Sequence, residues 1–195
     1  MYSYYLVYKP YGILSQFTPE GNKQGLSSFL TLPKDCYPVG RLDADSEGLL
    51  LITNDKSLNT RLLDPKEKHP RTYLVQVDGD ITEEAVEKLR QGVQIKVDGL
   101  PFMTGAAKVE KVEEPVLPPR NPPVRFRLTV PTSWIKLVIT EGKNRQVRHM
   151  TAAVGFPTLR LVRSEIGKLD IGQMIPGDLV EMERGELMRK LGISG

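Results

Sequence analysis

The sequence predicts an α+β protein in which short helices fall irregularly between the strands of a mixed, largely antiparallel sheet. Segments with strand-type patterns outnumber segments with helical periodicity along the 195 residues. The connections are rich in turn-forming residues, since the chain holds 17 glycines and 15 prolines. A hydrophobic content of 39% is enough to bury a core.

The expected strands are bounded by turn residues such as Gly, Pro, Asn and Asp. They cover residues 4–8, 49–53, 72–78, 93–97, 106–112, 125–130, 134–140, 158–166 and 179–182. The clearest pattern places Tyr73, Val75 and Val77 on one face of a strand. The two segments before and after residues 131–133 would form a hairpin.

The helices are expected from their first and last residues. They cover residues 25–32, a segment after Asn54-Asp55 that runs to residue 63, residues 82–90 and 145–154, and a short charged stretch near the C-terminus. Asn54-Asp55 would form a turn or the N-cap of the helix that runs to residue 63. Thr82 and Asn144 would cap the next two helices, and Gly155 would end the helix at 145–154.

Five prolines fall between residues 115 and 123, which excludes a helix or a central strand there. The segment predicts an extended loop, or a seam between two subdomains near residues 113–124. Residues 1–195 contain no internal repeat or low-complexity tract, so we expect a single domain with that one internal boundary.

The absence of certain sequence features counts against several classes of protein. Its apolar runs are far shorter than the ~20 residues of a membrane span, and its first residues lack the pattern of a signal peptide. The single Cys36 and two histidines leave no disulfide framework and little basis for a metal site. No phosphate-loop, dinucleotide-binding or zinc motif is present. We therefore expect a cytoplasmic protein of a reducing compartment.

The charge is unevenly distributed along the chain. Residues 120–163 hold nine basic residues and the single acid Glu141, a net charge of +8 that leaves −5 elsewhere, because the total is +3. Such segregation is typical of a surface that binds a polyanion, although solvated arginines on separate faces would also account for it.

An acidic cluster lies directly before the strand expected at 49–53. Residues 40–48, GRLDADSEG, place Asp43, Asp45, Glu47 and Arg41 between two glycines. A carboxylate on such a loop can act as a nucleophile or a base, and the glycines permit close approach of a ligand. The alternative is structural, because loop aspartates commonly form Asx-turns or cap helices.

A basic cluster follows at residues 141–149, EGKNRQVRH. Arg145, Arg148 and His149 would share one helix face, at spacings of three and four. Such a helix start can hold phosphates, or one arginine can pair with a carboxylate, or the face can simply be solvated. Tyr73 likewise can pack within the sheet or stack on a nucleobase.

Both clusters belong to longer motifs that resemble the signature of the pseudouridine synthases, in the branch that acts on ribosomal RNA. The main motif is GRLDADSEGLLLITND at residues 40–55. Shorter motifs match in the family's order: KPYG at 9–12, RTY at 71–73, EGKNRQVR at 141–148 and RSEIG at 163–167. The resemblance covers almost the whole chain. Residues 119–125 and 131–134 most resemble members that modify RNA of the large ribosomal subunit.

The resemblance implies a role for each residue that matches a motif. Asp43 would be the catalytic carboxylate, Tyr73 the ring that packs on the target uracil, and Arg148 the partner of the carboxylate. Leu161 aligns with an apolar residue that lines the pocket. The implied substrate-binding residues are Arg41, Lys143, Asn144, Arg145 and Arg163.

The resemblance also implies the fold and the reaction. The sheet would be bent, with flanking helices and a central RNA-binding cleft, and no S4-type domain would precede the first strand. The reaction would isomerise uridine to pseudouridine in ribosomal RNA, with 23S rRNA as the expected substrate. It needs no cofactor and no metal, because no electron or group is gained. The implied partner is RNA, bound by a monomer without membrane attachment.

Two other functions stay open on the residues alone. One is a catalytically silent RNA-binding module, against which the presence of Asp43, Tyr73 and Arg148 counts. The other is a glycoside hydrolase with Asp43 and Asp45 as its carboxylate pair, supported only by their proximity in sequence.

Overall fold

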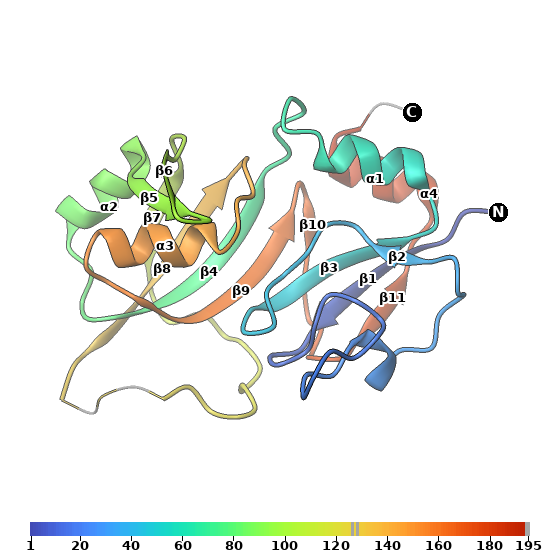
Figure 1. Cartoon of the computed structure of the whole chain (residues 1–195), viewed down its shortest axis with the longest axis horizontal. Helices are drawn as coiled ribbons and strands as arrows, with labels where there is room; N and C mark the ends of the chain where they lie inside the picture. The colour runs from blue at the N-terminus through green and yellow to red at the C-terminus, as the bar shows by residue number, and fades with distance from the viewer. Residues whose placement is uncertain (126, 128, 194–195) are drawn as a thin grey trace. The chain divides into compact units, whose positions relative to one another are not determined.

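The structure is a computed structural model that describes residues 1–125, 127 and 129–193 (Figure 1). The chain divides into two compact units: unit 1 comprises Met1–His69 and Arg163–Gly195, and unit 2 comprises Pro70–Val162. The division therefore falls elsewhere than the seam expected near residues 113–124, which lies inside unit 2. The proline-rich segment itself is extended, as predicted.

Unit 1 contains strands β1, β2, β3, β10 and β11, the C-terminal part of β9, and three helices. Their bounds are β1 Tyr4–Lys9, β2 Tyr37–Pro38, β3 Glu47–Thr53, β9 Thr158–Ile166, β10 Leu169–Asp170, β11 Leu179–Glu181, η1 Leu26–Ser28, α1 Lys56–Leu63 and α4 Arg184–Leu191. The strand order is β11-β1-β3-β9, with β2 beside β3 and β10 beside β9. Strand β1 is antiparallel to both neighbours, pairing Tyr5 with Ile52 and with Glu181.

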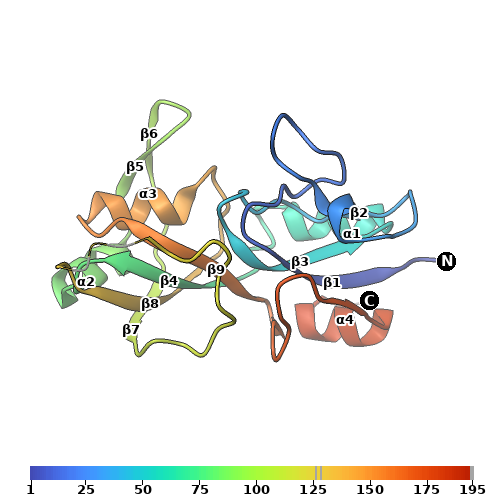
Figure 2. The ribbon, with the colours of Figure 1, turned by 90° about the horizontal axis from the view of Figure 1, so that it is seen from below.

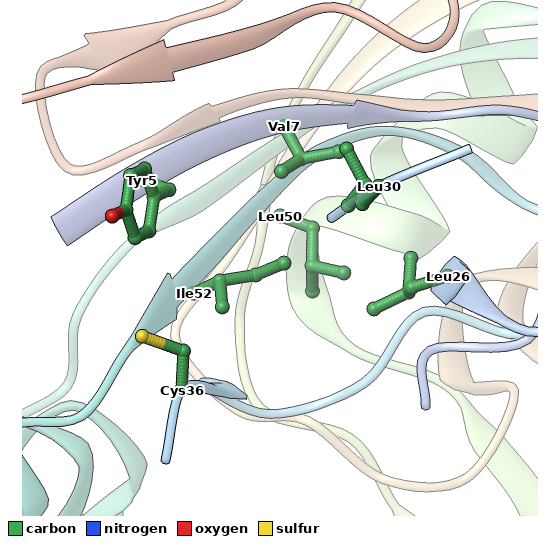
Figure 3. Close-up of a cluster of buried hydrophobic side chains, with 7 residues drawn as sticks. All are labelled: Tyr5, Val7, Leu26, Leu30, Cys36, Leu50 and Ile52. Carbon is green, nitrogen blue, oxygen red and sulfur yellow. The ribbon is translucent and has the colours of Figure 1, made fainter. Parts of the chain in front are cut away.

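The core of unit 1 forms around β1 and β3, whose central residues are apolar. All six residues of β1 and all seven of β3 are buried, so both faces of this part of the sheet are covered. Figure 3 shows Val7 and Leu50 of the two strands packed with Leu26, Leu30 and other buried residues on one face. In Figure 2, α1 and η1 lie on one side of β1 and β3, and α4 lies on the other.

Unit 2 contains the N-terminal part of β9, strands β4 to β8 and two helices. Their bounds are β4 Arg71–Asp78, α2 Glu83–Gln91, β5 Gln94–Val97, β6 Leu100–Met103, β7 Lys108–Val112, β8 Thr132–Ile139 and α3 Gln146–Ala153. The strand order is β9-β4-β8-β7, and β5 and β6 form a separate antiparallel hairpin. Strand β8 is antiparallel to both β4 and β7, which places Tyr73 opposite Leu137.

The predicted helix caps are confirmed for α1 and α2. The Asp55 carboxylate accepts from the backbone N–H groups of Ser57 and Leu58, and the Thr82 hydroxyl accepts from Ala85 N–H. Gly155 has φ 90°, as expected just after the end of α3.

Other elements differ from the prediction. The helix expected over 25–32 is one 3-10 turn, Leu26–Ser28, because Gly25 offers no capping side chain and Pro33 follows closely. Strands β2, β6 and β10 were not predicted from the sequence; they are two to four residues long. The strand expected over 125–130 is wrong for the residues described there, 125, 127, 129 and 130, which are not in a strand; residues 126 and 128 lie outside the described residues. The predicted hairpin is therefore not found in the described part of the chain, and β8 pairs with β4 and β7 instead. Among the residues that the structure describes, no helix is long and apolar enough to cross a membrane.

Candidate active site

The acidic loop, defined here as residues 41–46, joins β2 to β3 in unit 1 and carries the half-buried side chain of Asp43. Ser15 holds its backbone just before Asp43. The Leu42 N–H donates to the Ser15 hydroxyl at 2.9 Å, and that hydroxyl donates to the Leu42 carbonyl at 2.8 Å. The Asp43 carboxylate is therefore carried by a fixed backbone, which is what a reacting group requires.

Lys9 holds the same loop just after Asp43. Its side chain is 0% exposed. Its ammonium donates to two carbonyl oxygens of the following turn, at 2.9 and 2.6 Å, and to the Ala44 carbonyl at 3.5 Å. The Ala44 carbonyl also accepts from the Gly12 N–H at 2.7 Å. Residues on both sides of Asp43 are thus bonded to the segment that follows β1.

The charges of the acidic loop bear directly on Lys9. Burial lowers the pKa of Lys9 from 10.5 to about 7, while the carboxylates of Glu47, Asp45 and Asp43 oppose that shift. Lys9 is therefore a buried cation, and its burial cost is partly offset by Glu47 at the start of β3 and by the two aspartates of the acidic loop.

We predict that Lys9 makes the stability of the protein depend on pH. Because its pKa is about 7 when folded and near 10.5 when unfolded, the unfolded chain holds one more proton between these pH values. The free energy of unfolding should therefore rise with pH in this window, by up to ~1.4 kcal/mol per pH unit. The measurement is the free energy of unfolding in urea at pH 7 to 10, for the wild type and for Lys9→Met. The difference between the two proteins removes the contributions of the other titrating groups. A difference that stays flat over this window would contradict the prediction.

Arg163 and Arg41, both predicted substrate-binding residues, differ in exposure. Arg41 is exposed, whereas Arg163 is 3% exposed on the part of β9 that belongs to unit 1. The Arg163 Nε donates to the Leu49 carbonyl of β3 at 2.8 Å. Gly48 has φ 105°, and a Cβ there would collide with the Arg163 carbonyl oxygen. The side-chain bond of Arg163 is structural, and the close approach of its backbone to Gly48 requires glycine at position 48.

In unit 2, Tyr73 and Leu161 come from neighbouring strands. Tyr73 lies on β4 and is 8% exposed, and Leu161 lies on β9 and is 5% exposed. Tyr73 is largely buried, but it lies close to the start of its strand. Both residues belong to the buried part of the sheet.

The basic loop, defined here as residues 141–145, leads into α3. Lys143, Asn144 and Arg145 are all exposed there. The structure corrects two predictions. Asn144 does not cap the helix, because the N-cap position is the next residue; the Asn144 Nδ2 instead donates to the Asp98 carboxylate at 3.3 Å. Arg145 is itself the N-cap residue, with φ 50° in the left-handed region, so it precedes the helical face on which it was expected.

Arg148 lies in the first turn of α3 with a half-buried side chain. That turn contains no acidic residue, and the positive end of a helix dipole disfavours nearby cations. Helix stability therefore does not explain why three cations, Lys143, Arg145 and Arg148, lie at this helix start. An anionic ligand would explain their position, because N–H groups and cations at a helix N-terminus together hold phosphates.

The two units divide the predicted site residues between them. Unit 1 carries Arg41, Asp43 and Arg163, and the remaining six belong to unit 2: Tyr73, Lys143, Asn144, Arg145, Arg148 and Leu161. Sequence reasoning gave no role to the residues that hold the loops, notably Lys9, Ser15 and Gln146. Two signals for Lys9 were available: its place at the end of an otherwise apolar strand and its place in the KPYG motif. Within the described part of the chain, no three His, Cys, Asp or Glu residues are grouped to hold a metal ion.

The sequence and the fold of the chain resemble those of known proteins. Residues 3–153 match the family model of RNA pseudouridylate synthase, so the chain belongs to the RNA pseudouridylate synthase family. The ribosomal large subunit pseudouridine synthase E of Vibrio parahaemolyticus is 51% identical over 175 residues, covering 90% of this chain and 71% of that protein. The synthase of the same name from Xanthomonas axonopodis pv. citri is 52% identical over 174 residues, covering 88% of this chain and 89% of that protein.

A solved structure supports the fold separately. A crystal structure of a pseudouridylate synthase covers 97% of this chain, and this chain covers 74% of it, with a TM-score of 0.79 and 24% identity. The α+β class predicted from the sequence is thereby confirmed as the pseudouridine synthase fold.

Proposed function

We propose that this protein isomerises uridine to pseudouridine in ribosomal RNA, with 23S rRNA of the large subunit as its substrate. The observation that carries the proposal is the identity of about half of the residues to synthases of that name over most of the chain. The fixed acidic loop supports it, since it carries Asp43 where the family has its catalytic carboxylate.

The reaction breaks the N1–C1′ bond of the uridine, turns the base over and joins C5 to C1′. Asp43 acts on the sugar, either as a nucleophile at C1′ or as the base at C2′, and both routes need an ionised carboxylate. Burial disfavours ionisation of a carboxyl group, and a guanidinium partner restores it. We assign that partner to Arg148, the packing on uracil to Tyr73 and an apolar pocket wall to Leu161.

The basic loop is proposed to bind the RNA backbone. A uridine inside a helix must leave the stack before its sugar and base can be reached. Lys143, Asn144 and Arg145 are exposed at the start of α3, where phosphates around a flipped nucleotide can be held. Arg41 is an exposed candidate on the acidic loop, and Arg163 stays a predicted binding residue that is buried in unit 1.

The experiment that tests the proposal measures release of tritium from C5-tritiated uridine in an in vitro transcript of 23S rRNA. Isomerisation frees that label, whereas an RNA-binding module or a glycoside hydrolase would not. Pseudouridine mapping of the product then identifies the modified position. RNA binding without label release would support the silent module, and release of reducing sugar would support the hydrolase.

We predict that activity survives exhaustive dialysis against EDTA and needs no nucleotide or other cofactor. The isomerisation gains no electron and no group, so the chain's own residues suffice. Tritium release should be unchanged after dialysis, once monovalent salt is raised to keep the RNA folded. A loss that one particular metal restores would contradict this prediction.

We further propose that the enzyme acts in the cytoplasm as a monomer. A single cysteine, Cys36, which is buried and free, suits a reducing compartment. The mass of the purified protein in solution tests the oligomeric state.

A further inference from the structure

Gln146 is a buried polar residue at the first position of α3, and it faces back into the basic loop. It is 3% exposed. Its Oε1 accepts from the Lys143 N–H at 2.9 Å, and its Nε2 donates to the Glu141 carboxylate. One side chain thus ties the first residue of the loop to its middle. A neutral amide is suited to this position, because it supplies a donor and an acceptor together.

The loop is also attached to the segment around the β5–β6 hairpin, which stands beside α3 in Figure 2. The Glu141 Oε1 accepts from the Gly105 N–H at 2.9 Å. The Lys143 ammonium lies 5.0 Å from the centre of the Phe102 ring. Together with the Asn144 bond to Asp98, these contacts place the loop against residues 98–105. Gln146 and Glu141 are the central pair of this arrangement, because Glu141 bonds both Gln146 and Gly105.

The loop needs such support, because its conformation is unfavourable by itself. Arg145 has φ 50°, which a residue with a side chain seldom adopts. The cations Lys143 and Arg145 lie at the positive end of α3 without an acid in its first turn. Without the hydrogen bonds of Glu141 and Gln146, the positive φ of Arg145 and the closeness of the two cations to the helix start would relax.

We infer that Gln146 is a positioning residue which, through its bonds to Glu141 and Lys143, fixes the basic loop in the conformation that binds RNA phosphates. The inference rests on the proposed function only for the identity of the ligand, RNA. Gln146 itself is buried and acts through Lys143 and Arg145, whose side chains are exposed.

The test compares the single variant Gln146→Glu with a double variant in which the donor and acceptor roles of Glu141 and Gln146 are exchanged. Gln146→Glu places two carboxylates together and removes the donor, so the affinity for a 23S rRNA transcript should fall about tenfold or more. The slope of log K against log salt should flatten by about one, as one phosphate contact is lost. The double variant Glu141→Gln with Gln146→Glu restores a donor, an acceptor for Gly105 and an acceptor for Lys143. Its RNA affinity should return to within about threefold of the wild type.

Two further variants separate a lost bond from an added charge. Gln146→Met removes both hydrogen bonds without a charge and should lower affinity about as much as Gln146→Glu. Gln91→Glu is the matched control, because the Gln91 amide also donates to a glutamate, Glu87, at 2.9 Å on the exposed surface of α2. It adds the same charge in the same unit and should leave RNA affinity unchanged.

The outcomes show whether Gln146 positions the basic loop or only contributes to the stability of the fold. Thermal unfolding of each variant is measured beside its RNA affinity, and rescue by the double variant is a result that overall destabilisation would not give. Wild-type affinity in Gln146→Met, or no recovery in a folded double variant, would overturn the inference. If the wild type released no tritium, the proposed function would fail, whereas the pattern of RNA affinities would still test Gln146.

Discussion

Asp43→Asn is expected to abolish pseudouridine formation while leaving RNA affinity unchanged. An amide keeps the shape of the carboxylate but cannot act as a nucleophile or as a strong base, so the rate at saturating RNA should fall by about 10⁴-fold or more. The backbone bonds around Asp43 do not involve its side chain, so the acidic loop should keep its conformation. Tritium release and filter binding of the same transcript measure the two effects. Turnover beyond that supplied by deamidation of the new asparagine would contradict the role of Asp43.

Asp45→Asn is the matched control for this prediction. Asp45 lies on the same loop, and its carboxylate also raises the pKa of Lys9. Both substitutions therefore remove one charge from the surroundings of Lys9, and both should destabilise the folded protein to a similar degree. Only Asp43→Asn should remove catalysis. If Asp45→Asn is equally inactive while folded, the two carboxylates act together and the hydrolase reading gains support.

Most of the longer strands and their apolar faces could be predicted from the sequence, because alternation and turn residues are local signals. The segment around Tyr73 and the long strand Thr158–Ile166 are confirmed on that basis. The caps of α1 and α2 were predictable for the same reason, since Asp55 and Thr82 act on residues two or three positions away.

The start of α3 shows where local reasoning fails. Asn144 has the chemistry of a cap, but a carboxylate 46 positions earlier in the chain binds its amide. That contact depends on where the β5–β6 hairpin lies, and the sequence does not show it. The buried Lys9 was missed for a related reason, because its partners are backbone carbonyls, including that of Ala44, 35 positions away. Motifs gave the candidates for the reacting residues, but not the residues that hold them.

The division of the chain was also beyond sequence reasoning. Prolines at 115–123 indicate an extended segment, and on the sequence alone such a segment is equally consistent with a boundary between two subdomains. In the structure the boundaries fall at residues 69–70 and 162–163, the second of them inside β9. A strand shared by two units carries no break in composition, so no local signal could have located it.

Arg148→Ala is expected to lose far more catalysis than Lys143→Ala or Arg145→Ala, by about 10²–10³-fold at saturating RNA. The proposed role of Arg148 is to pair with the Asp43 carboxylate, so its loss should lower the rate itself rather than the affinity for RNA. The exposed Lys143 and Arg145 should instead contribute to binding. Removing either should weaken RNA affinity and flatten the salt slope by about one, with little effect on the rate once RNA is saturating.

The comparison is made on single-turnover tritium release at saturating transcript, from pH 6 to pH 9, with thermal unfolding of each variant. Saturation removes binding defects from the rate and leaves catalytic ones, so Arg148 separates from Lys143 and Arg145 by the rate alone. The half-buried side chain of Arg148 distinguishes it from the two exposed cations, which is why a different response is expected of it. Full turnover of Arg148→Ala at saturating RNA and neutral pH would make Arg148 a phosphate contact. The carboxylate partner would then have to be another arginine, and Arg41 on the acidic loop is the next residue to test.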